Sequence, residues 1–146
     1  MLVTSVKIRP ATRREVGKFF RAVNRSHMRS ETDLLSAGRL ELADEFFLAI
    51  ADQKIVGAVC LVLDNGKGAE LLTEYVLKAY HGRGIGTRLT RTAIERLISL
   101  GRTPIFVNVA SKGMDRTLEK LPKQFRRHLR LNKVYQKYGE VDLPER

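Results

Sequence analysis

Cysteine is nearly absent from this chain, since Cys60 is the only one in 146 residues. No disulfide can therefore form within the chain, and a single thiol inside an apolar run is typical of a small core residue in a reducing compartment. That run, Ile55 to Leu63, is also far shorter than the roughly 20 apolar residues that cross a membrane. The first ten residues lack the basic-then-apolar layout of a secretory signal. We therefore expect a cytoplasmic protein that does not insert into membranes.

Internal repeats, low-complexity stretches and Pro- or Ser-rich linkers are absent as well. The composition is 43% hydrophobic, which is ordinary for a globular protein, and the length is enough for one well-buried core. We therefore predict a single domain over residues 1–146.

Acidic residues are scarce, with 16 Asp and Glu against 27 Lys and Arg, which gives a net charge of +11. A surface of this sign favours an anionic partner. A nucleic acid, an acidic protein and a polyphosphate cofactor all meet that description, and charge alone does not choose among them.

What the chain does contain is a regular succession of apolar patterns separated by turn residues. Strands are expected at Val3–Ile8, Phe46–Ala51, Ile55–Leu63, Ala69–Leu77 and Pro104–Ala110, with a short last strand at Glu140–Leu143. Helices are expected at Ala11–Asn24, Glu31–Leu42, Ile85–Leu100, Met114–Leu121 and Pro122–Tyr138. Three strands joined by tight turns should form an antiparallel meander, and the strand-helix-strand unit after them should be a right-handed parallel crossover. The prediction is an α/β (α+β) fold with a single mixed, mostly antiparallel sheet flanked by helices.

The most informative segment, Tyr80 to Leu89, carries three glycines between a predicted strand and a predicted helix. Backbone N–H groups at a helix start, together with the helix dipole, can hold a phosphate or pyrophosphate. The segment is no P-loop, because Thr87 and Arg88 follow the last glycine where a lysine is required. It also fails the G-x-G-x-x-G spacing of dinucleotide sites, because Thr87 stands at the third glycine. From these residues alone, the segment is either a phosphate-binding loop or a helix start whose glycines allow tight packing.

The surrounding residues narrow this choice, because the stretch from Val76 to Leu89 resembles the acyl-CoA signature of the GNAT superfamily of N-acyltransferases. That signature reads Gln/Arg-x-x-Gly-x-Gly/Ala after a strand that ends in valine. His81, Gly84 and Gly86 occupy its defining positions, with histidine in place of glutamine or arginine. The segment 135–139, Tyr-Gln-Lys-Tyr-Gly, is similar to the Tyr-Glu-Lys-Leu-Gly that ends the family's fourth helix.

The resemblance implies the family's fold from Val3 to about Gly139, with two departures. Extra residues, roughly Ser111 to Leu121, lie between the fifth strand and the helix that bears Tyr135. The family's closing hairpin also has no room before Arg146, so the C-terminal hairpin is expected to be truncated. Either a partner subunit supplies the missing strand, as in a homodimer, or the sheet is shorter.

The resemblance further implies acetyl-CoA as the acyl donor. Its pantetheine would lie beside the end of the strand at Val76 and Leu77, where a β-bulge would release backbone groups to bond it. Its pyrophosphate would rest on the backbone of residues 81–87, and Arg83 and Arg88 would either contact phosphate oxygens or lie exposed at the helix start. The implied cofactor-binding residues are Val76, Leu77, His81, Gly82, Arg83, Gly84, Ile85, Gly86 and Thr87.

Two residues are candidates for proton transfer to and from an amine acceptor. Glu74 and Glu70 both lie on the strand beside the expected thioester and should share a face. Glu74 is the preferred base because it is nearer the cofactor end; otherwise it is an exposed strand carboxylate paired with a cation. Tyr135 resembles the family's general acid, and otherwise it is a helix tyrosine packed against the sheet. The three histidines and Cys60 lack the spacing of metal ligands, so no metal is expected.

The acceptor site is expected near the loop around Ser26 to Thr32, and the residues there do not identify the acceptor, which is an amine on a small molecule, a peptide or a protein. Between residues 115 and 138 the predicted helices are strongly basic. This surface is either a solvated face or a site that attracts RNA, tRNA or an acidic acceptor. The leading hypothesis is an N-acetyltransferase, and the alternative is a non-catalytic binding module of the same fold that binds RNA or an acidic partner.

Overall fold

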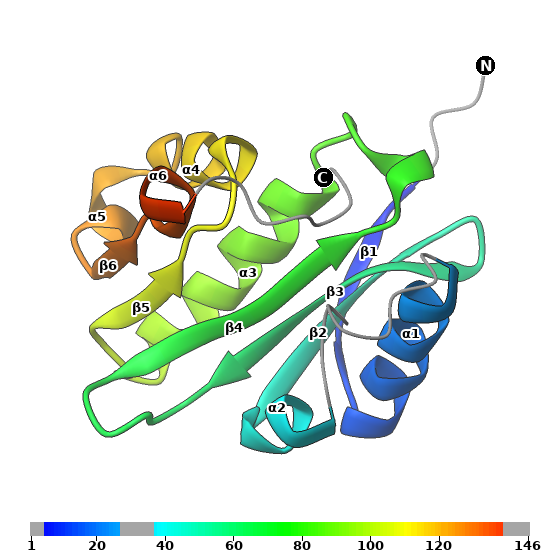
Figure 1. Cartoon of the computed structure of the whole chain (residues 1–146), viewed down its shortest axis with the longest axis horizontal. Coiled ribbons are helices and arrows are strands. Elements are labelled where there is room, and N and C mark those ends of the chain that lie inside the picture. Colours follow the sequence, from blue (N-terminus) through cyan, green and yellow to red (C-terminus); the bar gives the residue numbers. More distant parts are fainter. Residues whose placement is uncertain (1–4, 27–36, 139–146) are drawn as a thin grey trace.

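A computed structural model describes residues 5–26 and 37–138 of the chain. Within these residues, six strands form one sheet in the order β1-β2-β3-β4-β5-β6, antiparallel from β1 to β4 and parallel from β4 to β6 (Figure 1). The strands are β1 (Lys7–Ala11), β2 (Glu45–Ala51), β3 (Lys54–Val62), β4 (Ala69–Val76), β5 (Ile105–Asn108) and β6 (Leu129–Asn132). The helices are α1 (Arg13–Ser26), α2 (Ala37–Leu42), α3 (Ile85–Ser99), α4 (Lys112–Glu119), α5 (Lys123–Arg126) and α6 (Val134–Tyr138), with one 3₁₀ turn, η1 (Lys78–Tyr80). The predicted mixed sheet with its antiparallel meander and parallel crossover is confirmed.

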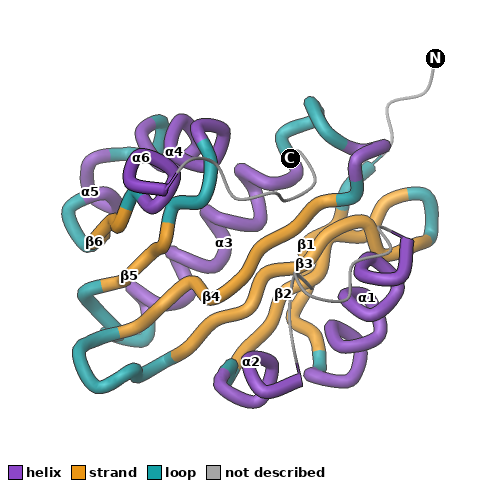
Figure 2. Tube along the Cα trace, in the orientation of Figure 1, coloured by secondary structure: helices purple, strands orange, loops and turns teal. Residues whose placement is uncertain are grey.

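Helices cover both faces of the sheet, with α3 on one face and α1 on the other (Figure 2). Leu89 and Ile94 of α3 pack against Leu61 of β3, and all three are fully buried. Phe20 of α1 packs in a second cluster with Leu48 of β2. Within the described ranges, no helix is long and apolar enough to span a membrane.

The β3–β4 turn forms where the Asn-Gly signal predicts it. The side-chain carbonyl of Asn65 accepts hydrogen bonds from the backbone N–H groups of Lys67 and Gly68, each at 2.9 Å. The Asn65 N–H in turn donates to the Gly68 carbonyl at 2.8 Å. An asparagine side chain that binds its own turn in this way favours the hairpin over an extended connection.

A β-bulge interrupts β4 near its middle. Cys60 of β3 pairs with Thr73 and the next residue, Leu61, pairs with Leu71, so Leu72 is the extra residue. The bulge therefore lies at Leu72 and not at the predicted Val76–Leu77. The pairing of β4 with β5 covers Ala69–Leu71, after which β5 ends and the chain turns into α4 while β4 runs on (Figure 1).

The predicted helix over residues 122–138 is wrong. The chain there forms α5, then β6, then α6, and β6 pairs in parallel with β5 from Leu129 opposite Ile105 to Asn132 opposite Asn108. Phe125, Leu129, Asn132 and Tyr135 repeat at three- to four-residue spacing, as in a helix. The open edge of β5, however, offers a row of backbone hydrogen bonds that outweighs this weak local preference. The sixth strand, β6, thus lies within the segment 122–138 that is predicted to be helical.

Other boundaries differ by a few residues. β1 (Lys7–Ala11) begins four residues and ends three residues later than the predicted Val3–Ile8, and residues 1–4 lie outside the described part. Residues 31–36 of the second predicted helix and the last predicted strand, Glu140–Leu143, also lie outside it.

Gly68 gives a direct test of how β4 is positioned against β5. A Cβ at this position would lie 2.3 Å from the Pro104 carbonyl oxygen, which accepts the hydrogen bond of the Ala69 N–H. Because that neighbour is backbone, the strands must shift, and we expect Gly68→Ala to lower the free energy of unfolding by about 1–3 kcal/mol. Urea denaturation measures the loss, and Lys67→Ala in the same exposed turn is the control. Equal stability of the two variants would contradict the packing.

Candidate functional site

Helix α3 begins at the end of β4 through a loop with two glycines in the left-handed region. Gly82 has φ of 79° and Gly84, the N-cap, has φ of 76°, a conformation that only glycine adopts easily. Because Gly84 has no side chain, no side-chain hydrogen bond caps the helix, and the first intrahelical bond runs from Arg88 N–H to the Gly84 carbonyl. The N–H groups of residues 85–87 therefore have no acceptor within the helix. Such a helix start binds anions.

The loop is held in place by the side chains of Tyr80 and His81. His81 Nε2 lies 2.7 Å from the carbonyl oxygen of Val76, so the ring bridges the loop to the end of β4. The buried Tyr80 donates its hydroxyl to Asp52 Oδ2 in the β2–β3 turn at 2.8 Å. These two contacts tie the start of the loop to the sheet.

The two arginines near the loop are engaged away from the backbone N–H groups. The Arg83 guanidinium lies over the ring of Tyr80, 4.8 Å from its centre, in a cation–π contact. Arg88 donates from Nη1 to the Val6 carbonyl at 3.0 Å. The predicted phosphate contacts of these arginines would require both side chains to leave these positions.

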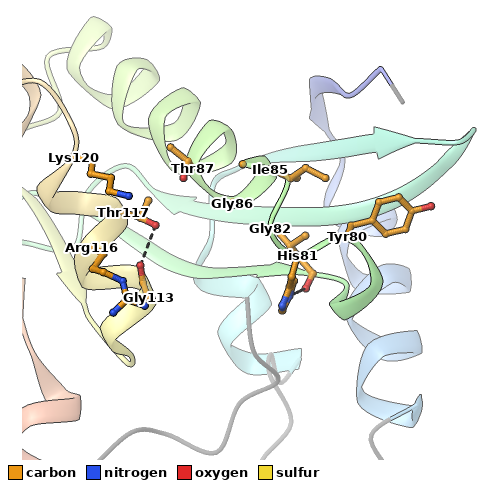
Figure 3. Close-up of a pocket in the computed structure, with 12 residues that line it drawn as sticks. Tyr80, His81, Gly82, Ile85, Gly86, Thr87, Gly113, Arg116, Thr117 and Lys120 are labelled. Carbon is orange, nitrogen blue, oxygen red and sulfur yellow. Dashed lines mark hydrogen bonds between the residues drawn. The ribbon is translucent and has the colours of Figure 1, made fainter. Parts of the chain in front are cut away.

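A pocket of about 230 Å³ opens between this loop and α4 (Figure 3). Most of the predicted cofactor-binding residues line it: Val76, His81, Gly82, Gly84, Ile85, Gly86 and Thr87, together with Tyr80. Leu77 and Arg83 are not among its lining residues. The loop and the end of β4 thus meet at one cavity.

The opposite wall of the pocket is a part of the chain that the sequence analysis did not link to the cofactor. One face of α4 supplies Gly113, Arg116, Thr117 and Lys120. These positions are three or four residues apart, so they lie on one face of the helix. A helix face with a glycine and two cations is the pattern in the sequence that indicates this wall of the pocket.

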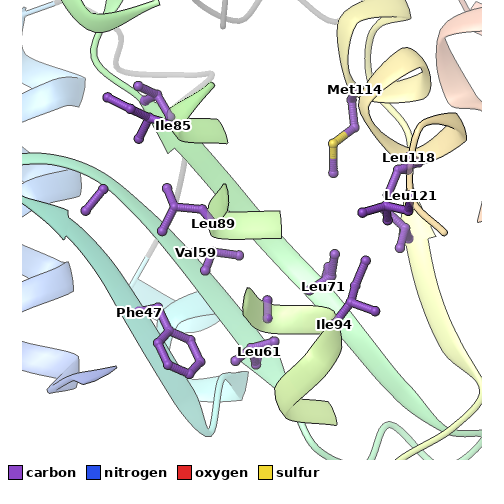
Figure 4. Packing of buried hydrophobic residues seen from close by; sticks show 14 of the residues in the cluster. Phe47, Val59, Leu61, Leu71, Ile85, Leu89, Ile94, Met114, Leu118 and Leu121 are labelled. Carbon is purple, nitrogen blue, oxygen red and sulfur yellow. The ribbon is translucent and has the colours of Figure 1, made fainter. Parts of the chain in front are cut away.

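Helix α4 is anchored from its other side. Met114, Leu118 and Leu121 are buried in the same core as Ile94 and Leu71 (Figure 4). The Ser111 side chain caps the helix by accepting from the Met114 N–H at 3.2 Å. The position of the second wall is therefore set by core packing.

Glu74 points toward α3. Its Oε2 accepts a hydrogen bond from the fully buried Thr90 hydroxyl of α3 at 2.9 Å. The expectation that Glu70 and Glu74 share a face is wrong, because the bulge at Leu72 shifts the alternation by one residue. Glu70 instead accepts from the Asn65 side chain at 3.2 Å. Glu74 does not line the pocket.

Tyr135 belongs to a polar cluster on another side of α4. Its hydroxyl donates to Asp115 Oδ2 at 2.5 Å, and Lys133 Nζ lies 3.2 Å from the same oxygen. Asp115 is 5% exposed, and its Oδ1 is buried with no hydrogen-bond partner among the described residues. Asp115 follows the pocket-lining Gly113 by two residues, which turns it about 200° around the helix. The hydroxyl of Tyr135 is therefore bonded on the side of α4 away from the pocket.

The charges of this cluster shift the titration of its members. The hydrogen bond to the Asp115 carboxylate, aided by partial burial, raises the pKa of Tyr135 above its ordinary 10.0. The same carboxylate raises the pKa of Lys133. A tyrosine in this setting is a weaker acid than in water as long as it stays bonded to Asp115.

Two further predictions concern metal binding and the acceptor segment. Within residues 5–26 and 37–138, no group of three or more His, Cys, Asp or Glu side chains is arranged to hold a metal ion. The predicted acceptor segment, Ser26 to Thr32, lies almost wholly outside the described residues.

Asp115→Asn tests the polar cluster. Removing the carboxylate charge should lower the pKa of Tyr135 toward 10.0, because the anion is the main reason for its rise. Since the folded-state pKa is raised, this contact stabilises the fold below about pH 10 and is lost as the pH rises through the folded value. Ultraviolet titration, taken as the difference between each protein and its Tyr135→Phe counterpart, measures the shift. An unchanged Tyr135 titration would exclude the Asp115 contact.

Comparison with known proteins agrees with this geometry. The model of the acetyltransferase (GNAT) family matches residues 11–118, which run from the end of β1 through most of α4. Tyr135 lies beyond the matched residues. No curated protein matches the chain.

Solved structures with the same fold have low sequence identity. An IAA acetyltransferase from Bacillus cereus superposes with a TM-score of 0.63 at 21% identity, covering 80% of this chain and 75% of that one. A GNAT family N-acetyltransferase from Escherichia coli, in complex with CoA, superposes with a TM-score of 0.62 at 14% identity, covering 80% of this chain and 69% of that one. An aminoglycoside acetyltransferase from an uncultured soil metagenomic sample superposes with a TM-score of 0.56 at 18% identity, covering 97% of this chain and 91% of that one. These likenesses concern the fold, and the family match covers well over half of the chain. The chain therefore belongs to the GNAT acetyltransferase family.

Proposed function

We propose that the protein transfers an acetyl group from acetyl-CoA to a primary amine of an acceptor. The observation that carries this proposal is the pocket at the start of α3, where uncapped N–H groups face α4 beside the end of β4. Such a site combines anion binding at a helix start with an adjacent strand edge for an extended chain. A relative of the same fold, from Escherichia coli, is known in complex with CoA.

In this proposal the pyrophosphate of the cofactor rests on the N–H groups of residues 85–87, in the cavity lined by Gly82, Gly84 and Gly86. Pantetheine continues along the edge of β4 beyond its pairing with β5, which ends at Leu71. Leu77 is a poor partner for it, since the Leu77 N–H already donates to the Val56 carbonyl at 2.8 Å. His81 lines the pocket and also contacts the Val76 carbonyl. In this proposal it therefore affects cofactor binding both directly and by fixing the end of β4.

Acetyl transfer to an amine requires two proton movements. An alkylammonium with a pKa of about 10.4 is neutral in about 1 molecule in 2,500 at pH 7, a cost of roughly 4.6 kcal/mol that a base must offset. The amine lone pair then attacks the thioester carbonyl, a C–N bond forms and the C–S bond breaks. The attacking nitrogen loses a second proton to the solvent, and the CoA thiolate takes up a proton from the acid. Glu74 is the proposed base, with Thr90 orienting its carboxylate. Tyr135 is the proposed acid, a role that requires its hydroxyl to leave Asp115 and reach the pocket side of α4.

The acceptor is proposed to be an amine on a small molecule, a peptide or a protein. One relative of the same fold is an aminoglycoside acetyltransferase, and another is a ribosomal-protein-alanine N-acetyltransferase from Brucella melitensis. Assembly as a homodimer, and contact with RNA or tRNA when the acceptor carries it, remain predictions of the same proposal.

A second candidate function is a non-catalytic binding module for RNA or an acidic partner. It is favoured by one observation: residues 120–138, which form α5, β6 and α6 at one edge of the sheet, contain many Lys and Arg but no Asp or Glu. Lys123, Arg126, Arg127 and Arg130 are exposed there. RNA binding that weakens steeply with salt, together with no detectable acetyl-CoA binding at millimolar concentration, would favour this module over the enzyme.

Gly86→Leu tests the cofactor pocket without weakening its helix. Leucine favours helix over glycine by about 1 kcal/mol, so the fold should persist while the side chain fills the cavity. We expect acetyl-CoA binding to be lost in calorimetry, together with thiol release in the presence of amines, aminoglycosides, peptides or aminoacyl-tRNA. Ser99→Leu, at the other end of α3, is the matched control and should bind normally. Normal binding by Gly86→Leu would contradict the proposed site.

Tyr135→Phe tests the acid role. A general acid contributes about 10²–10⁴-fold, so kcat should fall by at least that lower factor while acetyl-CoA affinity stays nearly constant. Lys133→Met removes the other contact to Asp115 and so reports the structural part of the effect. An unchanged kcat in Tyr135→Phe would remove Tyr135 from the mechanism, and an equal fall in Lys133→Met would make its role structural.

A further inference from the structure

The pocket wall formed by α4 carries the positive charge that the glycine loop lacks. The loop has no P-loop lysine, Arg83 stacks on Tyr80, and Arg88 bonds to the Val6 carbonyl. Arg116 and Lys120 of α4, by contrast, line the pocket, and neither forms an ion pair with another described residue. Figure 3 shows both side chains extending from the side of α4 that faces the loop.

Arg116 and Lys120 are spaced to act together. They are four residues apart on one helix, so their side chains leave α4 about 6 Å from each other along its axis and on the same face. The hydrophobic side of α4, with Leu118 and Leu121 in the core, keeps this face turned toward the pocket. Two cations at this spacing can converge on one phosphate group, with the guanidinium supplying a bidentate contact.

The proposed cofactor has one more anionic group than the loop can bind. The N–H groups at the start of α3 match a pyrophosphate, and the helix dipole supplies only about half a positive charge. CoA also carries a ribose 3′-phosphate, a monoester with a charge of about −1.5 to −2 at pH 7. This group is attached to the ribose beyond the pyrophosphate, so it lies at a distance from the loop and needs its own partner.

Resting on the proposed function, we infer that Arg116 and Lys120 bind the ribose 3′-phosphate of CoA and make the site selective for CoA over 3′-dephospho-CoA. The loop and α4 then divide the recognition of the cofactor. Backbone N–H groups hold the pyrophosphate, and the two side chains of α4 recognise the phosphate that distinguishes CoA from its precursor. Because both side chains are exposed, this selectivity should decline as salt is added.

The test compares two ligands across matched variants. Calorimetry gives the Kd of CoA and of 3′-dephospho-CoA for the wild type and for the double variant Arg116→Ala/Lys120→Ala. The control is Arg14→Ala/Lys18→Ala, which removes an exposed arginine and lysine at the same spacing on α1. We expect the wild type and the control to bind CoA about tenfold more tightly than 3′-dephospho-CoA, because two exposed charge-assisted contacts would provide that difference. The α4 variant should bind the two ligands within twofold of each other, with its dephospho-CoA affinity unchanged.

Three results would overturn the inference. Equal wild-type affinity for the two ligands would mean that the 3′-phosphate is not recognised. A preference that survives in the α4 variant would assign its recognition to other residues, and an equal loss for both ligands would assign the pair to the pyrophosphate. Failure of the wild type to bind either ligand would instead reject the proposed function itself. Single variants Arg116→Gln and Lys120→Gln, each expected to lose part of the preference, keep the test valid should the double variant fold poorly.

Discussion

The whole site depends on how α3 starts: Gly84 adopts a left-handed conformation at the end of β4, and no side chain caps the helix that follows. That geometry leaves the N–H groups of residues 85–87 without helical acceptors and directs them into a cavity. The sheet fixes this position, because His81 bonds to the Val76 carbonyl and Tyr80 bonds to Asp52. A helix start of this kind favours an anionic partner.

A second consequence follows from where β4 and β5 part. Their pairing covers Ala69–Leu71, and β5 then gives way to α4, whose buried side rests on the core formed with α3. The same turn of the chain thus opens the edge of β4 and builds the facing wall of the pocket. The pocket and the free edge of β4 therefore arise from one feature of the topology.

Local signals in the sequence predicted the parts of the fold that local interactions determine. The Asn65 turn, the meander and the glycine loop each follow from residues close together in the chain, and the structure contains all three. The bulge at Leu72 and the strand β6 depend on partners far away in sequence, so neither the faces of Glu70 and Glu74 nor the broken segment 122–138 could be read from periodicity. The role of α4 was hidden for the same reason, because Arg116 meets the loop only in the folded chain.

The central claim is that an acyl-CoA cofactor binds between the start of α3 and α4. Titration of ¹⁵N-labelled protein with CoA, followed by amide chemical shifts, tests it most directly. The account predicts large shifts for residues 82–87 and for Gly113 to Lys120, with little change along α1 and β1. Shifts confined to the basic edge of α5, β6 and α6, or no shifts at millimolar CoA, would contradict it.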